Sequence, residues 1–189
     1  MTDVPEFQIS GAFMRAYYKT LVAQAMLEPV LDAIRVETRD FLAEPPSPWT
    51  WFDAEHGLNV LDALLTISSR EHVKLFGLKL AQLGLGPVLT PLVRTVLALS
   101  SASPRPLAVN LGFMMKPFLR GVQFVLEDRG PTAFLLTLNY PRPIGVGNFI
   151  AWEGLLHYAF ELTGKRGVVT RAPCGPTSAV AIYDVSWTP

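Results

Sequence analysis

The sequence has few of the residue types from which recognisable functional sites are built. It contains one cysteine and three histidines, and its 16 basic residues equal its 16 acidic residues. A single cysteine excludes an intramolecular disulfide and a cysteine-based zinc site. A formal net charge of zero argues against a nucleic-acid-binding domain, because such domains carry an excess of basic residues that neutralises phosphates. No phosphate-binding loop, dinucleotide fingerprint, nucleophile elbow or metalloprotease motif occurs.

Targeting signals and membrane-spanning runs are also lacking. Residues 1–6 have neither the basic start nor the apolar core of a signal peptide, so we expect a cytoplasmic protein. The most apolar region, residues 80–104, is interrupted by Gly84, Gly86 and two prolines, which disfavours a membrane-spanning helix. We expect a buried helix there and no membrane span.

What is abundant is apolar surface. Half of the 189 residues are apolar and 17% are charged, which excludes intrinsic disorder. The length suits one domain, residues 1–189, with a substantial core. So much apolar surface in an uncharged chain predicts either a hydrophobic pocket or a subunit interface, and therefore a small hydrophobic ligand or a homodimer.

The first half of the chain shows helical periodicity. Apolar residues at three- and four-residue spacing predict helices over residues 10–27, 29–42, 53–67, 69–83 and 87–99. Ser10 is the expected N-cap of the first helix, and Gly84 and Gly86 are expected to end the fourth. The turn-rich residues 100–106 then separate a helical half, residues 10–100, from a sheet-rich half, residues 107–187.

In the second half of the chain, the spacing of apolar residues changes from helical to β-type. Two β-rich runs around a glycine turn predict a hairpin, whose second strand should end at Pro141 and Pro143. A helix capped by Asn148 and two further strands follow, so the expected segments are 122–127, 132–140, 148–162, 167–172 and 179–187. This segregated order predicts an α+β fold, in which a β-β-α-β-β antiparallel sheet packs on helices. Residues 153–162 are apolar on nearly every side and should lie between the sheet and the helices or a second chain.

This layout, with its Cys174-Gly175 turn and aromatic last strand ending at Tyr183-Asp-Val-Ser-Trp187, resembles a superfamily of small-molecule sensors. The superfamily contains haem nitric-oxide-binding and vinyl-reductase-type domains, and the likeness is greatest to a family of myxobacterial paralogues of about this length. The haem branch carries a Tyr-x-Ser-x-Arg signature that holds the haem propionates, whereas this chain has Tyr140-Pro-Arg142-Pro. The vinyl-reductase branch often has several cysteines where only Cys174 stands. The resemblance therefore implies a scaffold that encloses a small ligand or dimerises, without a cofactor or metal.

One spacing suggests chemistry. Glu153, His157 and Glu161 stand at successive i, i+4 positions of a predicted helix, so their side chains share one face. A carboxylate beside an imidazole can orient it as a general acid or base. The same pattern is also typical of the solvated stripe of an otherwise apolar helix.

Aromatic and flexible side chains supply the candidate ligand-binding residues. Tryptophans in a proline-bounded loop often line a pocket mouth, and methionines adapt to varied partners. The candidates are Trp49, Trp51, Trp152, Tyr158, Arg142 and Met115. The favoured hypothesis is a non-catalytic regulatory or accessory domain that binds a small hydrophobic molecule, acting as a dimer. The alternative is a cofactor-independent enzyme, of cyclase or isomerase type, on a hydrophobic biosynthetic substrate with His157 as acid/base.

Overall fold

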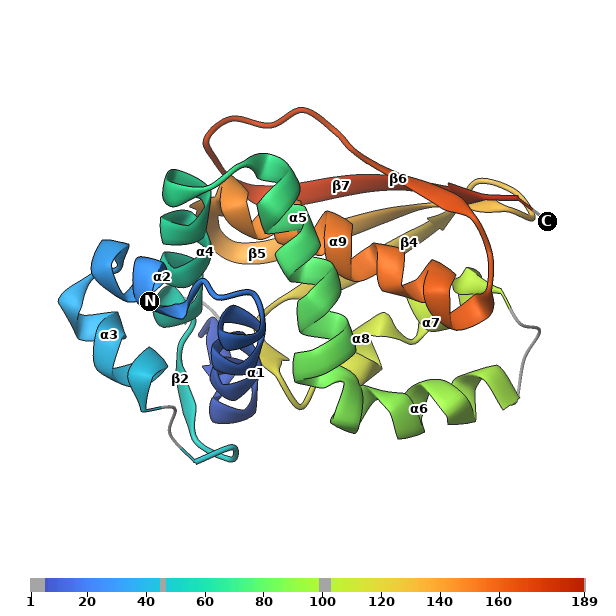
Figure 1. The fold of residues 1–189 in the computed structure, drawn as a ribbon. Helices are drawn as coiled ribbons and strands as arrows, with labels where there is room; N and C mark the ends of the chain where they lie inside the picture. The colour runs from blue at the N-terminus through green and yellow to red at the C-terminus, as the bar shows by residue number, and fades with distance from the viewer. Residues whose placement is uncertain (1–5, 45–46, 99–102, 189) are drawn as a thin grey trace.

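The computed structural model describes residues 6–44, 47–98 and 103–188 (Figure 1). Its helices and strands alternate little along the chain, as the sequence predicts for an α+β fold. The helical elements are α1 (Gly11–Ala23), α2 (Leu27–Ala33), α3 (Val36–Ala43), α4 (Glu55–Ile67), α5 (Arg70–Lys79), the π-helix η1 (Leu80–Leu85), α6 (Gly86–Ala98), α7 (Pro104–Val109), α8 (Leu111–Met115) and α9 (Val146–Thr163). The strands are β1 (Gln8–Ser10), β2 (Trp51–Asp53), β3 (Leu119–Arg120), β4 (Gln123–Asp128), β5 (Ala133–Gly145), β6 (Gly167–Arg171) and β7 (Thr177–Trp187).

The main sheet is antiparallel, with strand order β4-β5-β7-β6. The predicted hairpin is confirmed, since Phe124 pairs with Leu138 and Asp128 pairs with Phe134. Side chains alternate between a buried and a more exposed face along each strand, and the buried face includes Leu136 and Tyr183. This face packs on the helices.

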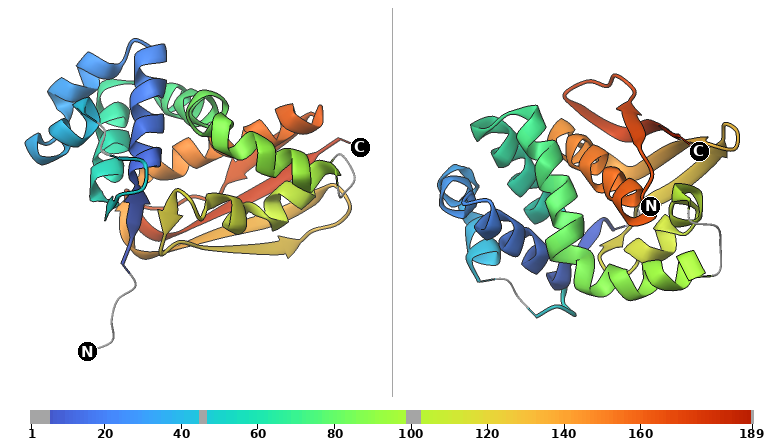
Figure 2. Two further views of the ribbon diagram at one scale, coloured as in Figure 1. Left: turned by 90° about the horizontal axis from the view of Figure 1, so that it is seen from below. Right: turned by 45° about the vertical axis from the view of Figure 1, so that its right-hand side comes forward.

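Helix α9 crosses the buried face of the sheet and is covered on its other side by α5 (Figures 1 and 2). It therefore lies between sheet and helices, as its sequence predicts. The contact with α5 is made by backbones: a Cβ placed on Gly77 of α5 would lie 1.8 Å from the carbonyl oxygen of Ala151 in α9. A Cβ on Gly154 of α9 would lie 1.8 Å from the carbonyl oxygen of Lys74. Only glycine permits so close a crossing at these two positions.

Strand β1 forms a second, small sheet of order β2-β1-β3, which the sequence did not predict. Ile9 pairs with Phe52 on one side and with Leu119 on the other. The small sheet therefore ties the start of the chain to two distant segments. It holds Phe7 and Ile9 in the core, at 7% and 2% exposure.

Three local predictions are wrong. Gly84 does not end a helix, because the chain continues through η1 into α6. A Cβ on Gly84 would lie 2.7 Å from the Cβ of Ala16 in α1. Glycine at this position therefore allows η1 and α1 to pack closely together. Pro141 and Pro143 do not end β5, which passes them through a bulge between Asn139 and Ile144. Asn148 lies inside α9, whose N-cap is Gly145.

Other boundaries shift by smaller amounts. Ser10 caps α1 as predicted, accepting a hydrogen bond from the backbone N–H of Phe13 at 3.3 Å. The helix predicted over residues 29–42 is interrupted where Ile34 and Arg35 adopt extended backbone. The predicted turn at residues 100–106 lies partly outside the described residues. Within the described ranges, no helix has both the length and the hydrophobicity that a membrane crossing requires.

Candidate functional site

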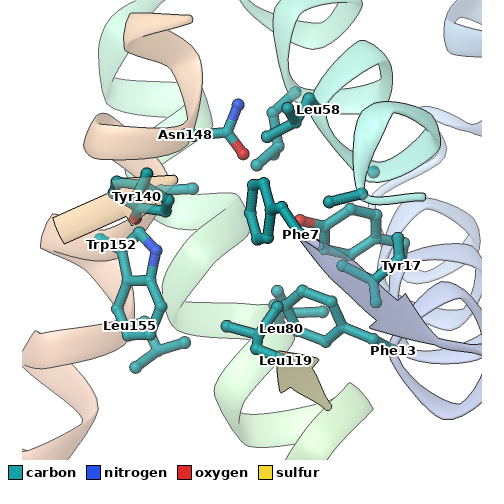
Figure 3. A pocket seen from close by; sticks show the side chains of 15 residues that line it. Phe7, Phe13, Tyr17, Leu58, Leu80, Leu119, Tyr140, Asn148, Trp152 and Leu155 are labelled. Carbon is teal, nitrogen blue, oxygen red and sulfur yellow. The ribbon is translucent and has the colours of Figure 1, made fainter. Parts of the chain in front are cut away.

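Two apolar cavities lie inside the protein, one on either side of the Leu155 side chain, which lines both. The first, which we call the Tyr140 cavity, has a volume of about 30 Å³ and is bounded by α1, β1, α4, β3, β5, the start of η1 and the first half of α9 (Figure 3). The second, the Met115 cavity, has a volume of about 50 Å³ and lies among α6, α7, α8, the sheet and the second half of α9. Each is large enough for no more than a few atoms as it stands.

Four side chains in the largely apolar wall of the Tyr140 cavity carry polar groups: Tyr17, Tyr140, Asn148 and Trp152. The buried amide nitrogen Nδ2 of Asn148 has no hydrogen-bond partner. The proton of the buried Tyr140 hydroxyl has no acceptor, although the indole N–H of Trp152 is close enough to donate a hydrogen bond to the hydroxyl oxygen. Figure 3 shows the Tyr140 hydroxyl beside the indole of Trp152, and Phe7 between Tyr140 and Tyr17. A buried polar group without a partner costs about 1–3 kcal/mol. Such a cost inside a cavity favours an additional molecule that supplies the missing hydrogen bond.

Burial also fixes the protonation state of the two phenols. Desolvation raises the pKa of Tyr140 far above its ordinary value, and the neighbouring Tyr17 raises it further. Burial likewise raises the pKa of Tyr17, with a second contribution from Asp62. Both hydroxyls therefore keep their protons at every physiological pH. The Tyr140 hydroxyl remains able to donate a hydrogen bond into the cavity.

The structure places three of the six candidate ligand-binding residues in cavity walls. Trp152 lines the Tyr140 cavity, while Tyr158 and Met115 line the Met115 cavity. The other three lie outside both walls. Trp49 is 87% exposed, Trp51 lies under the guanidinium of Arg120 at 3.7 Å, and Arg142 forms an ion pair with Asp53 of β2.

Tyr140, Asn148 and Leu155 are among the cavity residues that the sequence does not single out. The sequence predicts Asn148 as a helix cap, although it is a lone amide before the apolar run Phe149-Ile-Ala-Trp152. A polar residue beside such a run, a few positions after a strand that carries the hydroxyl of Tyr140, is the signal that the sequence offers. It indicates a buried polar group in need of a partner.

The Glu153, His157 and Glu161 side chains do not form a hydrogen-bonded trio. Glu153 is 3% exposed, and its Oε1 accepts hydrogen bonds from Arg70 Nη2 at 2.8 Å and Arg171 Nε at 3.1 Å. Arg171 is itself nearly buried and also donates to the sulfur of Cys174 at 2.8 Å. Glu153 therefore joins α9 to α5 and β6 as an ion-pair anchor.

His157 lies instead in an open groove of about 730 Å³ between α5 and the end of α9. Burial lowers the pKa of His157, and the ammonium of Lys74 lowers it further, against the opposite effects of Glu153 and Glu161. The exposed Glu161 is hydrogen-bonded to Gln82. A catalytic role for His157 stays a prediction.

No protein-family model matches the chain, and no curated protein sequence does. Its fold is nevertheless similar to that of solved H-NOX (haem nitric oxide/oxygen-binding) proteins. A Fe(II) unliganded H-NOX protein from K. algicida superposes with a TM-score of 0.69 at 10% identity, covering 96% of this chain and 97% of that one. An H-NOX protein from S. oneidensis in the Fe(II)NO state superposes with a TM-score of 0.62 at 15% identity, covering 96% of this chain and 100% of that one. An oxygen-binding H-NOX domain related to soluble guanylate cyclases superposes with a TM-score of 0.64 at 9% identity, covering 96% of both chains.

The residues present do not fit a haem. Both cavities are far smaller than a porphyrin. Of the described residues, those that line them include no histidine to bind iron and no lysine or arginine to pair with propionates. Arg142 lies outside both cavities and is paired with Asp53. No group of three His, Cys, Asp or Glu side chains able to hold a metal occurs within the described ranges. The chain therefore has the fold of the H-NOX proteins around an interior that does not fit haem.

Proposed function

We propose that this protein is a non-catalytic binding module that takes a small, mostly apolar molecule in the Tyr140 cavity. The observation that carries the proposal is the pair of buried polar groups on Tyr140 and Asn148 whose hydrogen-bonding capacity is not satisfied, in a largely apolar wall. A ligand that is apolar over most of its surface and has one hydrogen-bonding atom complements this wall. The similarity in fold to an oxygen-binding H-NOX domain and to an H-NOX protein in the Fe(II)NO state supports a small-ligand-binding role.

Binding requires the cavity to widen. Its present volume of about 30 Å³ is smaller than any organic ligand, so side chains of the wall have to move aside. Leu155 is the side chain best placed to do so, because the Met115 cavity provides free space directly behind it. Free apolar space of this kind remains dry and accepts apolar guests.

Replacing Tyr140 by phenylalanine tests the proposal through two effects of opposite sign. Without ligand, Tyr140→Phe should leave the free energy of unfolding unchanged or raise it by up to about 1 kcal/mol, because an unsatisfied hydroxyl is removed. Affinity for hexanol, used as a probe, should fall about fivefold, because the loss of one hydrogen bond costs about 1 kcal/mol. Urea unfolding and titration calorimetry measure the two effects.

A matched control is Tyr158→Phe, since Tyr158 lines only the Met115 cavity. It should change hexanol affinity less than Tyr140→Phe does. If Tyr140→Phe destabilised the free protein by about 1 kcal/mol or more, the hydroxyl would already be satisfied, for example by water, and the proposal would lose its basis.

The proposal includes self-association and a place among the myxobacterial paralogues of similar length. Val125, Val168 and Val180 are exposed at 51%, 59% and 40% on the sheet face turned away from α9. These exposed valines, set among polar side chains, support pairing with a second copy of the chain. Light scattering that returned the mass of one chain at high concentration would contradict the dimer and leave the ligand site untouched.

A further inference from the structure

The two cavities are arranged end to end along one helix. Asn148, Trp152 and Leu155 of α9 face the Tyr140 cavity, and Leu155, Ala159 and Leu162 face the Met115 cavity. These residues recur every three or four positions, so they form one continuous stripe along α9. From Asn148 to Leu162 the stripe extends for about 21 Å. The interior therefore has the layout of one long, narrow site that the Leu155 side chain divides.

An irregular helical turn borders the same division. Leu80 and Ala81 begin the π-helix η1; Leu80 lines the Tyr140 cavity and Ala81 lines the Met115 cavity. Both are buried, at 3% and 0% exposure. Single π-helical turns inside α-helices are frequently found at functional sites. The junction of the two cavities is thus bordered by α9 on one side and by the π-helix η1 on the other.

The two ends of this site differ in polarity. The unsatisfied groups of Tyr140 and Asn148 lie in the wall of the Tyr140 cavity. The Met115 cavity is lined almost entirely by carbon and sulfur atoms, among them the flexible side chains of Met114 and Met115. Of the described residues, none with a charged side chain lines either cavity. A carboxylate buried there would remain unpaired, which costs far more than burying a neutral oxygen.

We propose that the ligand is a linear apolar chain with one uncharged oxygen-bearing head, such as a long-chain alcohol, aldehyde or ketone. The head exchanges hydrogen bonds with Tyr140 and Asn148, and the chain runs along α9 past a displaced Leu155 into the Met115 cavity. This inference rests on the proposed function and adds the shape and charge of the ligand to it.

The test compares hexanol, decanol and decanoate as probes of the full-length protein by titration calorimetry. Decanol should bind at one equivalent and at least about tenfold more tightly than hexanol, because each additional buried methylene contributes about 0.8 kcal/mol. Decanoate at pH 8 should bind at least about tenfold more weakly than decanol, because its charge finds no partner.

Variants of Leu155 locate the chain. Leu155→Trp should fill the junction and weaken decanol binding at least about tenfold more than it weakens hexanol binding, because only the long chain has to pass this point. Leu155→Ala should open the junction and strengthen decanol binding, and it keeps the test usable if the larger residue prevents folding. Leu75→Trp is the matched control, since Leu75 is 45% exposed on α5 and lines neither cavity.

The outcomes separate the two levels of the account. Equal affinities for hexanol and decanol, or a decanol affinity that neither Leu155 variant changes, would overturn the proposal of an elongated ligand. A compact ligand in the Tyr140 cavity would then remain. Decanoate binding as tight as that of decanol would overturn the uncharged head. If neither alcohol bound at all, the proposed function itself would fail.

Discussion

Replacing Gly77 by alanine is expected to destabilise the protein by about 3 kcal/mol, because the added methyl group has no space. Its Cβ would lie 1.8 Å from the carbonyl oxygen of Ala151, a backbone atom of α9 that cannot rotate away. The two helices would have to separate, and α9 carries one wall of both cavities. The loss should appear as a lower urea midpoint with an unchanged slope, followed by far-ultraviolet circular dichroism.

Gly86→Ala is the control for this substitution. A Cβ at Gly86 would find its nearest neighbour, the carbonyl oxygen of Ala81, at 3.5 Å, which is an ordinary contact. Because alanine favours helix over glycine, this variant should be as stable as the wild type or up to about 1 kcal/mol more stable. A Gly77→Ala protein with wild-type stability would show that α5 and α9 do not cross as closely as described.

Replacing Glu153 by glutamine is the second large expected effect. The substitution keeps the shape of the side chain and removes the charge that compensates Arg171, whose side chain is 8% exposed. Leaving a buried charge without its partner costs about 3–5 kcal/mol, so Glu153→Gln should lower the free energy of unfolding by that order. Thermal and urea unfolding of the purified variant measure it.

Glu161→Gln provides the comparison on the same helix. Glu161 is exposed, and its loss should change the free energy of unfolding by no more than about 0.5 kcal/mol. The contrast separates an anchoring role of Glu153 from a general effect of charge on α9. Equal stabilities of the two variants would contradict the anchoring role.

The elements that could be predicted from the sequence are those fixed by local signals. The β4–β5 hairpin follows from β-rich runs around a glycine turn, and the central place of α9 follows from apolar residues on all of its sides. The small sheet could not be predicted, because Ile9 finds its partners Phe52 and Leu119 far along the chain. Three-residue strands carry too little pattern to be recognised, and their pairing is decided by tertiary packing.

Glycine is an ambiguous signal in this sequence for a physical reason. Gly84 was expected to end a helix because glycine commonly does so, yet here it lets η1 approach Ala16 of α1. A sequence does not distinguish a glycine that breaks a helix from one that makes room for a neighbour. The same ambiguity applies to the proposed site, for which Trp152, Tyr158 and Met115 are candidates because of their size and flexibility. The unsatisfied hydrogen-bonding capacity of Tyr140 and Asn148 depends on what surrounds them, which only the fold reveals.

The central claim is that apolar space on both sides of Leu155 accepts a guest. The most direct measurement is a crystal structure of the full-length protein under xenon pressure, because xenon enters dry apolar cavities without any specific contact. The account predicts xenon at two positions, one beside Tyr140 and one beside Met115, with the Leu155 side chain between them. Crystals in which neither position takes up xenon, and in which side chains fill both spaces, would contradict it.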